Sequence, residues 1–564
     1  MASLSIAAQD DRQPAGQQNR YLEVGKNLDI FNNVYKHLDL LYVDTLDPQR
    51  TITAAINGML RSLDPYTEYY PESETKRLEQ MITGKYAGIG ALIRQHLRLN
   101  RPVIDEPYAG MPAAEAGLRK GDIIISIDDT LMQGKPIGYV SSHLRGDPGT
   151  SFLLKIVRPT ASPSAVTFDK KGRATGGTEM TMRITRRNIK LSEISNVLLL
   201  ADSIGYIGLT QFTEGCAREV RKSVIDLKNR GAHSLVLDLR GNGGGSEMEA
   251  VELVNIFVPK GQTVVENRGK VAAASRTYRT QYEPVDTLMP LVVLVDGETA
   301  SASEITAGAL QDLDRATVLG TKTFGKGLVQ LPIDLPYNAS LKITTSKYYI
   351  PSGRCIQAIN YTKGRTDDRR PASLYGDRVP DSLTHVFHTR AGREVRDGGG
   401  ITPDVVLAND TMPNIAYYLS TTGLDSTEVL FDYVVDYISA HPTIASPMEF
   451  HLSDAEWADF CRRVSESGFA YDALSKSKFD ELVKVARFEG YYDEAREAFD
   501  ALERQLHHDV TNELTRHRST IQKILEMDII SAYYYERGSH EVSLTDDRQL
   551  LEARRLLRAR HLKN

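Results

Sequence analysis

One stretch of the chain, residues 291–330, contains a serine and a lysine placed where they could act together. A serine becomes a useful nucleophile only beside a base, and a lysine can be that base when burial leaves it uncharged. Ser301 follows a short apolar run, and Lys326 lies between Gly325 and Gly327 among apolar neighbours. These residue types and their setting are compatible with nucleophilic catalysis by a serine with a lysine base.

Backbone N–H groups that could stabilise a tetrahedral intermediate lie in the same part of the sequence. The N–H of Ala302 follows the serine at an expected helix start, where N–H groups lack intrahelical partners. A second donor could come from Gly245, the last residue of a glycine run, because glycine allows the backbone to approach a substrate closely. Removing one such donor typically costs roughly 2.7–4 kcal/mol of transition-state stabilisation.

Each of these residues also has an ordinary structural explanation. A serine at a helix start is most often an N-cap, a loop lysine is usually solvated, and a glycine run usually forms a turn. Residues 320–326 fit the start of a phosphate-binding loop, but Gly327 replaces the serine or threonine that binds magnesium, and residues 328–332 favour a strand. A zinc site at His385 and His388 lacks a third ligand, so no metal is expected.

The elements around the serine and the lysine are typical of an α/β protein. Residues 291–295 and 316–319 have the pattern of buried strands and are separated by a helix-like run over 304–310, which predicts a βαβ unit with parallel strands. An earlier unit has a strand over 233–239, then the glycine-rich loop and a helix over 246–258. If these strands lie parallel in one sheet, both loops emerge at the edge where open α/β sheets carry their chemistry.

The rest of the chain differs from this region in its pattern of apolar, glycine and charged residues. Residues 21–63 have helical apolar spacing, with a second helix over 48–63, and residues 84–158 show short strands punctuated by glycine. Residues 362–399 are polar and are expected to form a surface insertion. After about residue 412 the chain is helical and strongly charged, which is typical of a solvated accessory domain.

The bulk composition sets limits on the class of protein. The 564 residues are enough for several domains, and a net charge of −6 with 41% hydrophobic residues gives no reason to expect nucleic acid or an anionic membrane as a partner. Three widely separated cysteines predict neither a disulfide framework nor a zinc ribbon. No apolar run is long enough for a transmembrane helix, and the apolar start at residues 1–9 lacks the basic part of an export signal.

Residues 84–160 resemble a PDZ domain. The resemblance rests on the loop 88–91, and on AGL at 116–118 followed by KGD at 120–122. In that family the N–H groups of the loop bind the terminal carboxylate of a peptide, which then adds as a strand beside the following strand. An isolated GxG is usually only a tight turn, but several matching segments occur here in the family's order. The substrate-binding residues that the resemblance implies are Gly88, Ile89, Gly90 and Ala91.

Taken together, the motifs resemble peptidase family S41, the carboxyl-terminal processing (tail-specific) proteases. The resemblance is carried by ASASEI at 300–305, TFGKG at 323–327 with Gln330, and LDLRGNGGG at 237–245; LDPYT at 63–67 resembles the segment before the family's PDZ domain. It covers roughly residues 25–407. The polar insertion and the C-terminal helical region depart from the family pattern.

The resemblance implies a Ser-Lys dyad that needs no cofactor. The family's nucleophile is the serine followed by Ala-Ser-Glu, which selects Ser301 over Ser303, and the spacing to the lysine also fits. The site residues that it implies are the nucleophile Ser301, the general base Lys326, Gln330 as the residue that positions the lysine, and the N–H groups of Gly245 and Ala302 as the oxyanion hole.

We therefore expect an α/β (mixed α+β) multidomain protein whose protease core of strand–helix units carries an inserted PDZ-like domain and helical N- and C-terminal regions. The expected divisions are a disordered or processed start at 1–19, an N-terminal helical region at 20–83, a PDZ domain at 84–160, a protease core at 161–411, and a C-terminal helical accessory domain at 412–564.

The expected activity is that of a serine endopeptidase that recognises the free, apolar C-terminus of a protein or peptide substrate and cleaves near it. The family resemblance also implies export, to the periplasm. The alternative is a non-catalytic PDZ scaffold or tail-binding chaperone, although such a module has no use for the dyad. The natural substrate and the oligomeric state stay open, and a homo-oligomer is compatible with the sequence.

Overall fold

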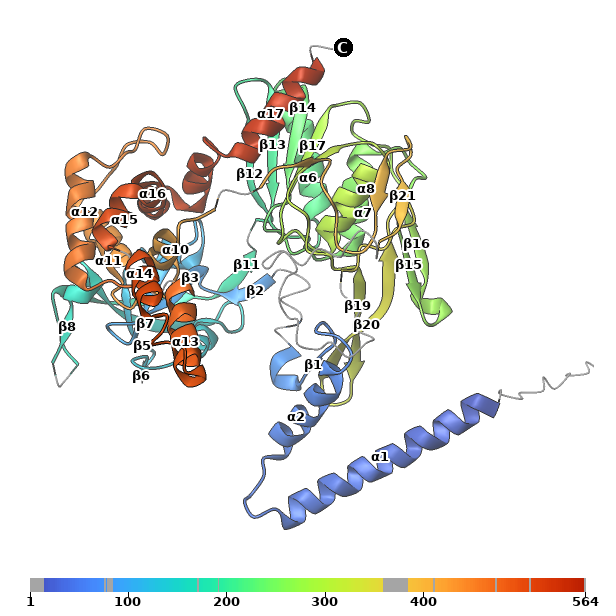
Figure 1. The fold of residues 1–564 in the computed structure, drawn as a ribbon, viewed down its shortest axis with the longest axis horizontal. Coiled ribbons are helices and arrows are strands. Elements are labelled where there is room, and N and C mark those ends of the chain that lie inside the picture. Colours follow the sequence, from blue (N-terminus) through green and yellow to red (C-terminus); the bar gives the residue numbers. More distant parts are fainter. Residues whose placement is uncertain are drawn as a thin grey trace, which may run out of the picture. The chain divides into compact units, whose positions relative to one another are not determined.

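The computed structural model describes residues 15–75, 78, 85–169, 172–190, 192–358, 384–408, 411–471, 474–506 and 509–561 (Figure 1). Most of the expected disordered start and most of the expected polar insertion lie outside these residues. The described chain separates into two compact units. The smaller unit contains the residues up to Thr75 together with Gln330–Thr344, and the larger unit contains the sheets that concern the candidate site.

The smaller unit begins with two helices, which confirm the prediction for residues 21–63. They are α1 (Ala15–Leu41) and α2 (Pro48–Arg61). α2 starts after Asp47, whose side chain accepts the N–H of Arg50 at 3.0 Å, and proline at the first helical position lacks the N–H that would go unpaired there.

A short antiparallel sheet completes the smaller unit. β1 (Glu68–Tyr70) pairs with the first part of β20 (Ala339–Tyr349), and β20 also pairs with β19 (Leu328–Leu335). The single-turn helix η1 (Glu72–Glu74) follows β1. Each of the two long strands continues into the larger unit.

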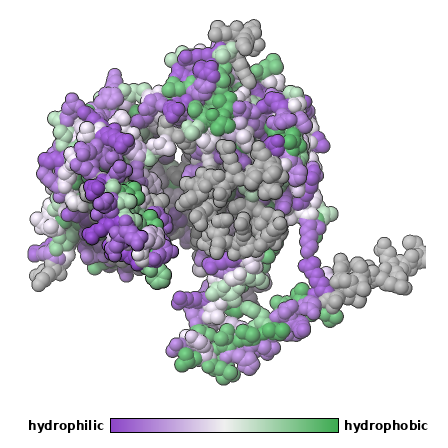
Figure 2. All heavy atoms as spheres, in the orientation of Figure 1, coloured by the Kyte–Doolittle hydropathy of each residue, from purple (hydrophilic) through white to green (hydrophobic). Residues whose placement is uncertain are grey.

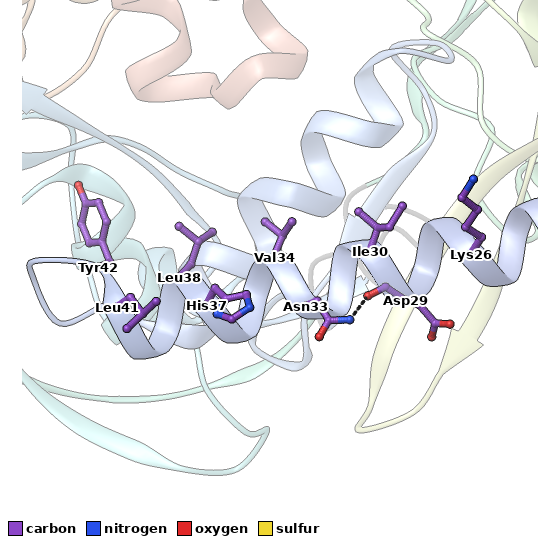
Figure 3. Close-up of a pocket in the computed structure, with 9 residues that line it drawn as sticks. All are labelled: Lys26, Asp29, Ile30, Asn33, Val34, His37, Leu38, Leu41 and Tyr42. Atoms are coloured by element: carbon purple, nitrogen blue, oxygen red, sulfur yellow. Dashed lines mark hydrogen bonds between the residues drawn. The ribbon is translucent and has the colours of Figure 1, made fainter.

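Apolar side chains on α1 are exposed to solvent. Ile30, Val34 and Leu38, and Tyr42 just after the helix, project in a row from one side (Figure 3), and their exposed fractions are 52%, 52%, 40% and 54%. Hydrophobic residues are visible along this part of the surface in Figure 2.

The larger unit is built on a six-stranded sheet with the order β12-β13-β14-β17-β18-β23. The strands from β13 onward are parallel, and β12 is antiparallel to β13. The predicted parallel βαβ unit is therefore confirmed. The strands are β12 (Ile194–Leu199), β13 (Ile204–Leu209), β14 (Ser234–Asp238), β17 (Leu291–Val295), β18 (Thr317–Gly320) and β23 (Val405–Val406).

Helices cover both faces of this sheet. Side chains such as Leu235 and Leu237 pack against one set of helices, whereas Val236 belongs to a second cluster with Leu550 and Leu557 near the end of the chain. Strands buried on both faces have the continuous apolar sequence seen here. The helices are α6 (Cys216–Asn229), α7 (Glu247–Phe257) and α8 (Ala302–Asp312) on the first face and α17 (Arg548–His561) on the second.

A second sheet of the larger unit has the order β10-β7-β5-β4-β3, with β6 beside β5. Two short helices and a hairpin turn at Asp128-Asp129 lie between the strands, and β10 lies beyond residue 160, the expected end of this region. The elements are β3 (Ala91–His96), β4 (Arg101–Pro107), α4 (Pro112–Glu115), β5 (Ile123–Ile127), β6 (Thr130–Leu131), α5 (Ile137–Leu144), β7 (Ser151–Pro159) and β10 (Gly177–Thr185).

Smaller elements connect these sheets. β2 (Lys85–Gly88) pairs with β11 (Arg187–Lys190), and β15 (Thr263–Gly269) pairs with the second part of β20. The others are β8 (Thr167–Phe168), β9 (Ala174–Thr175), β16 (Arg276–Arg279), β21 (Val386–His388), β22 (Glu394–Arg396), η2 (Pro163–Ala165) and η3 (Ala272–Ala274).

The C-terminal region is helical, as predicted, and packs around its own apolar core. No helix among the described residues is long and apolar enough to cross a membrane. The helices before α17 are α10 (Asn414–Ser420), α11 (Val429–Ala440), α12 (Asp454–Ser467), α13 (Leu474–Glu489), α14 (Arg496–Leu506), α15 (Val510–Arg516) and α16 (Arg518–Ser543).

The C-terminal helices also pack against the second sheet. Phe431 and Val435 of α11 share an apolar cluster with strand residues that include Val103 and Ile123. Lys120 is buried beside this cluster, and its Nζ lies 2.8 Å from a carboxylate oxygen of Asp528 on α16. The charged and apolar contacts together fix these helices to the sheet.

A break in α16 creates one more polar contact with the second sheet. Tyr535 has φ 61° and ψ −178°, which interrupts the helix, and the N–H of Glu536 donates to Oε1 of Glu106 on β4 at 2.9 Å. Burial raises the pKa of Glu106 to about 7, and the charges of Glu536 and Asp105 act in the same direction, whereas Lys120 opposes them.

Glu106→Gln should therefore change how stability depends on pH. Because the pKa of the folded state lies above the ordinary value of 4.5, ionisation of Glu106 destabilises the folded protein. This penalty is absent below about pH 4.5, develops as the pH rises to about 7, and is complete above it. The glutamine does not ionise, and its amide oxygen can still accept the N–H of Glu536. Thermal unfolding should therefore show the variant gaining stability over the wild type as the pH rises across this window.

The matched control is Glu115→Gln, which changes an exposed glutamate near the same sheet. Its unfolding temperature should follow that of the wild type at every pH. A difference between Glu106→Gln and the wild type that does not vary with pH would contradict the predicted ionisation penalty.

Candidate active site

Ser301 lies in the turn after β17, at the N-cap position of α8. Its φ of 56° and ψ of −116° are rare for a residue with a side chain, and such strain costs on the order of 1–3 kcal/mol. The residue is half-buried, whereas Ser303 is fully buried and its hydroxyl donates to the carbonyl oxygen of Asn242 at 2.9 Å. Of the two candidate serines, Ser301 is the one that remains partly accessible.

The glycine run packs directly against the serine turn. A Cβ atom on Gly244 would lie 2.6 Å from the carbonyl oxygen of Ala300 and 2.8 Å from Cβ of Ser301. A Cβ atom on Gly245, whose φ is 142°, would lie 2.2 Å from the carbonyl oxygen of Phe212. Only glycine fits at these two positions, and the close approach places the candidate oxyanion loop beside the candidate nucleophile.

The fully buried Asn242 ties the two loops together. Its carbonyl oxygen accepts the N–H of Ala300 at 3.0 Å and the hydroxyl of Ser303. Its side-chain oxygen accepts the N–H of Gly244 at 2.9 Å, and its side-chain nitrogen donates to the carbonyl of Leu209 at 2.8 Å. The prediction that both loops emerge at one edge of the sheet is therefore confirmed.

Lys326 is half-buried in the loop before β19, and two buried side chains connect it to Ser301. Oε2 of Glu304 accepts the N–H of Ser301 and the N–H of Lys326, each at 2.9 Å. The hydroxyl of Tyr348 lies 2.6 Å from the carbonyl oxygen of Lys326 and 3.2 Å from that of Ser301. The structure thus brings the predicted nucleophile and base segments to the same place.

Glu304 is fully buried and has an unusual electrostatic setting. Besides the two N–H groups at Oε2, its Oε1 accepts the N–H of Gly325 at 2.8 Å and the hydroxyl of Thr323 at 2.5 Å. Burial raises the pKa of Glu304 to about 7, against the effect of these hydrogen bonds. Sequence reasoning assigned this residue no role, although a serine followed three residues later by glutamate is the signature of a capping box.

Gln330 lies on β19 and belongs to the smaller unit. Its side-chain nitrogen donates to the hydroxyl of Thr344 on β20 at 3.1 Å. The role of Gln330 in positioning the lysine stays a prediction.

The predicted peptide-binding loop joins β2 to β3. Ile89 is buried, with its carbonyl oxygen accepting the N–H of Ala113 at 2.8 Å, and the carbonyl oxygen of Gly90 accepts the N–H of Tyr108 at 2.9 Å. Gly88 ends β2 and Ala91 begins β3. Within the described part of the chain, β3 pairs only with β4, so its other edge is where an added strand would lie.

The sequence suggests two alternative sites, a phosphate-binding loop at residues 320–326 and a zinc site at His385 and His388. The segment after Lys326 forms β19, as expected, and not the helix that a phosphate-binding loop requires. His385 contacts Asp397 at 3.0 Å, and the described residues contain no group of three or more histidine, cysteine or acidic side chains that could hold a metal ion.

Comparisons with protein-family models place known regions along the chain. The model of peptidase family S41 matches residues 203–368, and a PDZ-domain model matches residues 103–158. A third model, described as the C-terminal helical domain of a probable PDZ-protease, matches residues 420–557.

Individual relatives have corresponding names. A carboxy-terminal-processing protease of Bartonella bacilliformis is 34% identical over 365 residues, which are 64% of this chain and 78% of that protein. A probable CtpA-like serine protease of Staphylococcus aureus is 32% identical over 332 residues, 58% of this chain and 62% of the relative. Among solved structures, a photosystem II D1 C-terminal processing protease is 26% identical, with coverage of 67% and 86% and a TM-score of 0.35.

The matched models and relatives establish the family of this chain. The chain belongs to peptidase family S41 and is a serine-type peptidase of the carboxy-terminal-processing group, with a PDZ domain.

Gly245→Ala should abolish most peptidase activity. The added methyl group cannot coexist with the carbonyl oxygen of Phe212, so the loop must leave its present position beside Ser301. Loss of one oxyanion donor lowers kcat by about 10²–10³-fold. Gly243→Ala is the matched control, because a Cβ atom there meets nothing within 4 Å. Similar kcat values for the two purified variants would contradict the placement of the oxyanion loop.

Proposed function

We propose that this peptidase uses a Ser301–Lys326 dyad to cleave peptide bonds near the free C-terminus of a protein substrate held by its PDZ domain. The observation that carries the proposal is the convergence of three separate segments at one edge of the parallel sheet. Ser301, the glycine loop that ends at Gly245, and the Lys326 loop are joined there by buried hydrogen bonds.

In the proposed mechanism, Lys326 in its neutral form accepts the hydroxyl proton of Ser301 as the serine oxygen attacks the scissile carbonyl carbon. The N–H groups of Gly245 and Ala302 donate to the oxyanion of the tetrahedral intermediate. Lys326 then gives the proton to the leaving amine, which leaves an acyl-enzyme. Water attacks the ester with Lys326 again accepting a proton, and Ser301 is restored. By the family resemblance, Gln330 orients the lysine amine.

Substrate selection is proposed to take place at the loop 88–91. The N–H groups of Gly88, Ile89, Gly90 and Ala91 would bind the terminal carboxylate, and the tail would pair as a strand with the outer edge of β3. The edge position of β3 within the described residues supports this arrangement. Export to the periplasm remains the location that the family resemblance implies.

The dyad is tested with Ser301→Ala and Lys326→Ala acting on an unstructured polypeptide that ends in apolar residues. Each variant should lose cleavage by about 10³-fold or more, because the parts of a nucleophile–base pair act as a unit. In the wild type the rate should rise with pH as Lys326 loses its proton. Cleavage that persists in Ser301→Ala would remove the nucleophile assignment, and a flat pH–rate profile would count against a lysine base.

Tail recognition is tested separately by comparing that polypeptide with its C-terminally amidated twin. The amide removes the negative charge that the loop is proposed to bind, so KM should rise by about tenfold, equivalent to about 1.4 kcal/mol, while kcat changes little. Equal KM values for the two substrates would contradict carboxylate recognition. Binding of the free tail without cleavage by the wild type would instead favour a non-catalytic PDZ scaffold.

A further inference from the structure

We propose that Glu304 and Tyr348 are positioning residues that clamp the backbone of the nucleophile segment to the backbone of the base segment and so set the geometry of the dyad. The inference rests on the roles proposed for Ser301 and Lys326. Neither Glu304 nor Tyr348 is placed at the reacting atoms, and each contacts the peptide groups of both residues.

The Glu304 half of the clamp depends on a carboxylate. Each oxygen accepts two hydrogen bonds: Oε2 from the N–H groups of Ser301 and Lys326, and Oε1 from the N–H of Gly325 and the hydroxyl of Thr323. An ionised carboxylate accepts at about four lone-pair sites and donates nothing, so it satisfies all of these donors. In a Glu304→Gln variant the amide NH₂ would face two donors, which would leave buried N–H or hydroxyl groups unpaired.

Tyr348 closes the clamp from another element. It lies on β20 and is 1% exposed, and its hydroxyl is within hydrogen-bond distance of the carbonyl oxygens of Lys326 and Ser301. Glu304 thus holds the N–H groups of the two residues, and Tyr348 reaches their carbonyl groups. The peptide groups on both sides of each residue therefore lie within hydrogen-bond distance of one of the two side chains.

The strained backbone of Ser301 explains why such a clamp matters. A φ of 56° strains the backbone of Ser301, so the turn would lower its energy by changing this angle. The hydrogen bond from the N–H of Ser301 to Glu304 opposes that change. Catalytic groups must be held within about 0.5 Å of their productive positions, and a misplacement of about 1 Å can cost about 10²-fold in rate. A weakened clamp should therefore act on kcat and on acylation, with little effect on substrate binding.

Two variants with matched controls distinguish a loss of positioning of Ser301 and Lys326 from a general loss of stability. Glu304→Gln is paired with Asp425→Asn, because Asp425 is also buried and accepts two N–H groups and a threonine hydroxyl, but in the C-terminal helical region. Tyr348→Phe is paired with Tyr433→Phe, which removes a buried hydroxyl that donates to the carbonyl of Glu456 at 2.9 Å.

The experiment measures kcat, KM, the labelling rate with a fluorophosphonate, the pH–rate profile and the unfolding temperature of each full-length variant. Glu304→Gln should lower kcat and the labelling rate by about 10²-fold and Tyr348→Phe by about tenfold, with KM within about twofold of wild type. The apparent pKa of the pH–rate profile should shift in both. The two controls should lose comparable stability and keep the wild-type kcat and profile.

The result that would overturn the inference is a wild-type kcat and pH–rate profile, per folded molecule, in Glu304→Gln and Tyr348→Phe. If Glu304→Gln does not fold, Tyr348→Phe decides alone, because removing one hydroxyl leaves the packing of the ring in place. An inactive Ser301→Ala beside fully active clamp variants would leave the proposed function standing. An active Ser301→Ala would instead overturn the proposed function.

Discussion

A buried carboxylate is the constraint on which the candidate site depends. Placing Glu304 away from water is costly, and its ionised form is tolerable only because backbone N–H groups and a hydroxyl surround it. Those donors come from Ser301, the N-cap of α8, and from the loop before β19, two segments that the chain must bring together from either side of β18. The same hydrogen bonds that satisfy the carboxylate therefore fix the distance between Ser301 and Lys326.

The parallel sheet supplies the platform for this arrangement. β14 and β17 are neighbours, so the glycine loop and the serine turn leave the sheet at the same edge. Asn242 then joins these two loops by hydrogen bonds from both its backbone and its side chain. Because the platform is buried on both faces, α17 at the end of the chain contributes to the same structure that carries the site.

The C-terminal helices have a second structural role at the PDZ region. Apolar contacts from α11 and the ion pair between Lys120 and Asp528 connect them to the second sheet. Charged residues are rarely buried unless they are paired, and Lys120 is paired with carboxylates from β4 and from α16. The helical region is thus attached both to the peptidase sheet, through α17, and to the PDZ sheet, through α11 and α16.

The sequence alone determined the local elements and the chemical character of the site. Apolar period and glycine placement predicted β14, β17, α7 and α8 closely, because burial on both faces of a parallel sheet requires continuous apolar runs. The motifs around Ser301, Lys326 and Gly245 indicated a serine peptidase through their resemblance to peptidase family S41.

Only the tertiary structure decided which contacts join the segments that carry Ser301, Lys326 and Gly245. The hydrogen bonds of Glu304, Tyr348 and Asn242 join residues far apart in the chain, and nothing in local sequence shows which distant peptide group a buried side chain will meet. The packing of α17 on the sheet was hidden for a similar reason, because a charged helix needs only a narrow apolar stripe to cover a face. Local pattern follows from short-range periodicity, whereas long-range contacts follow from the folded backbone.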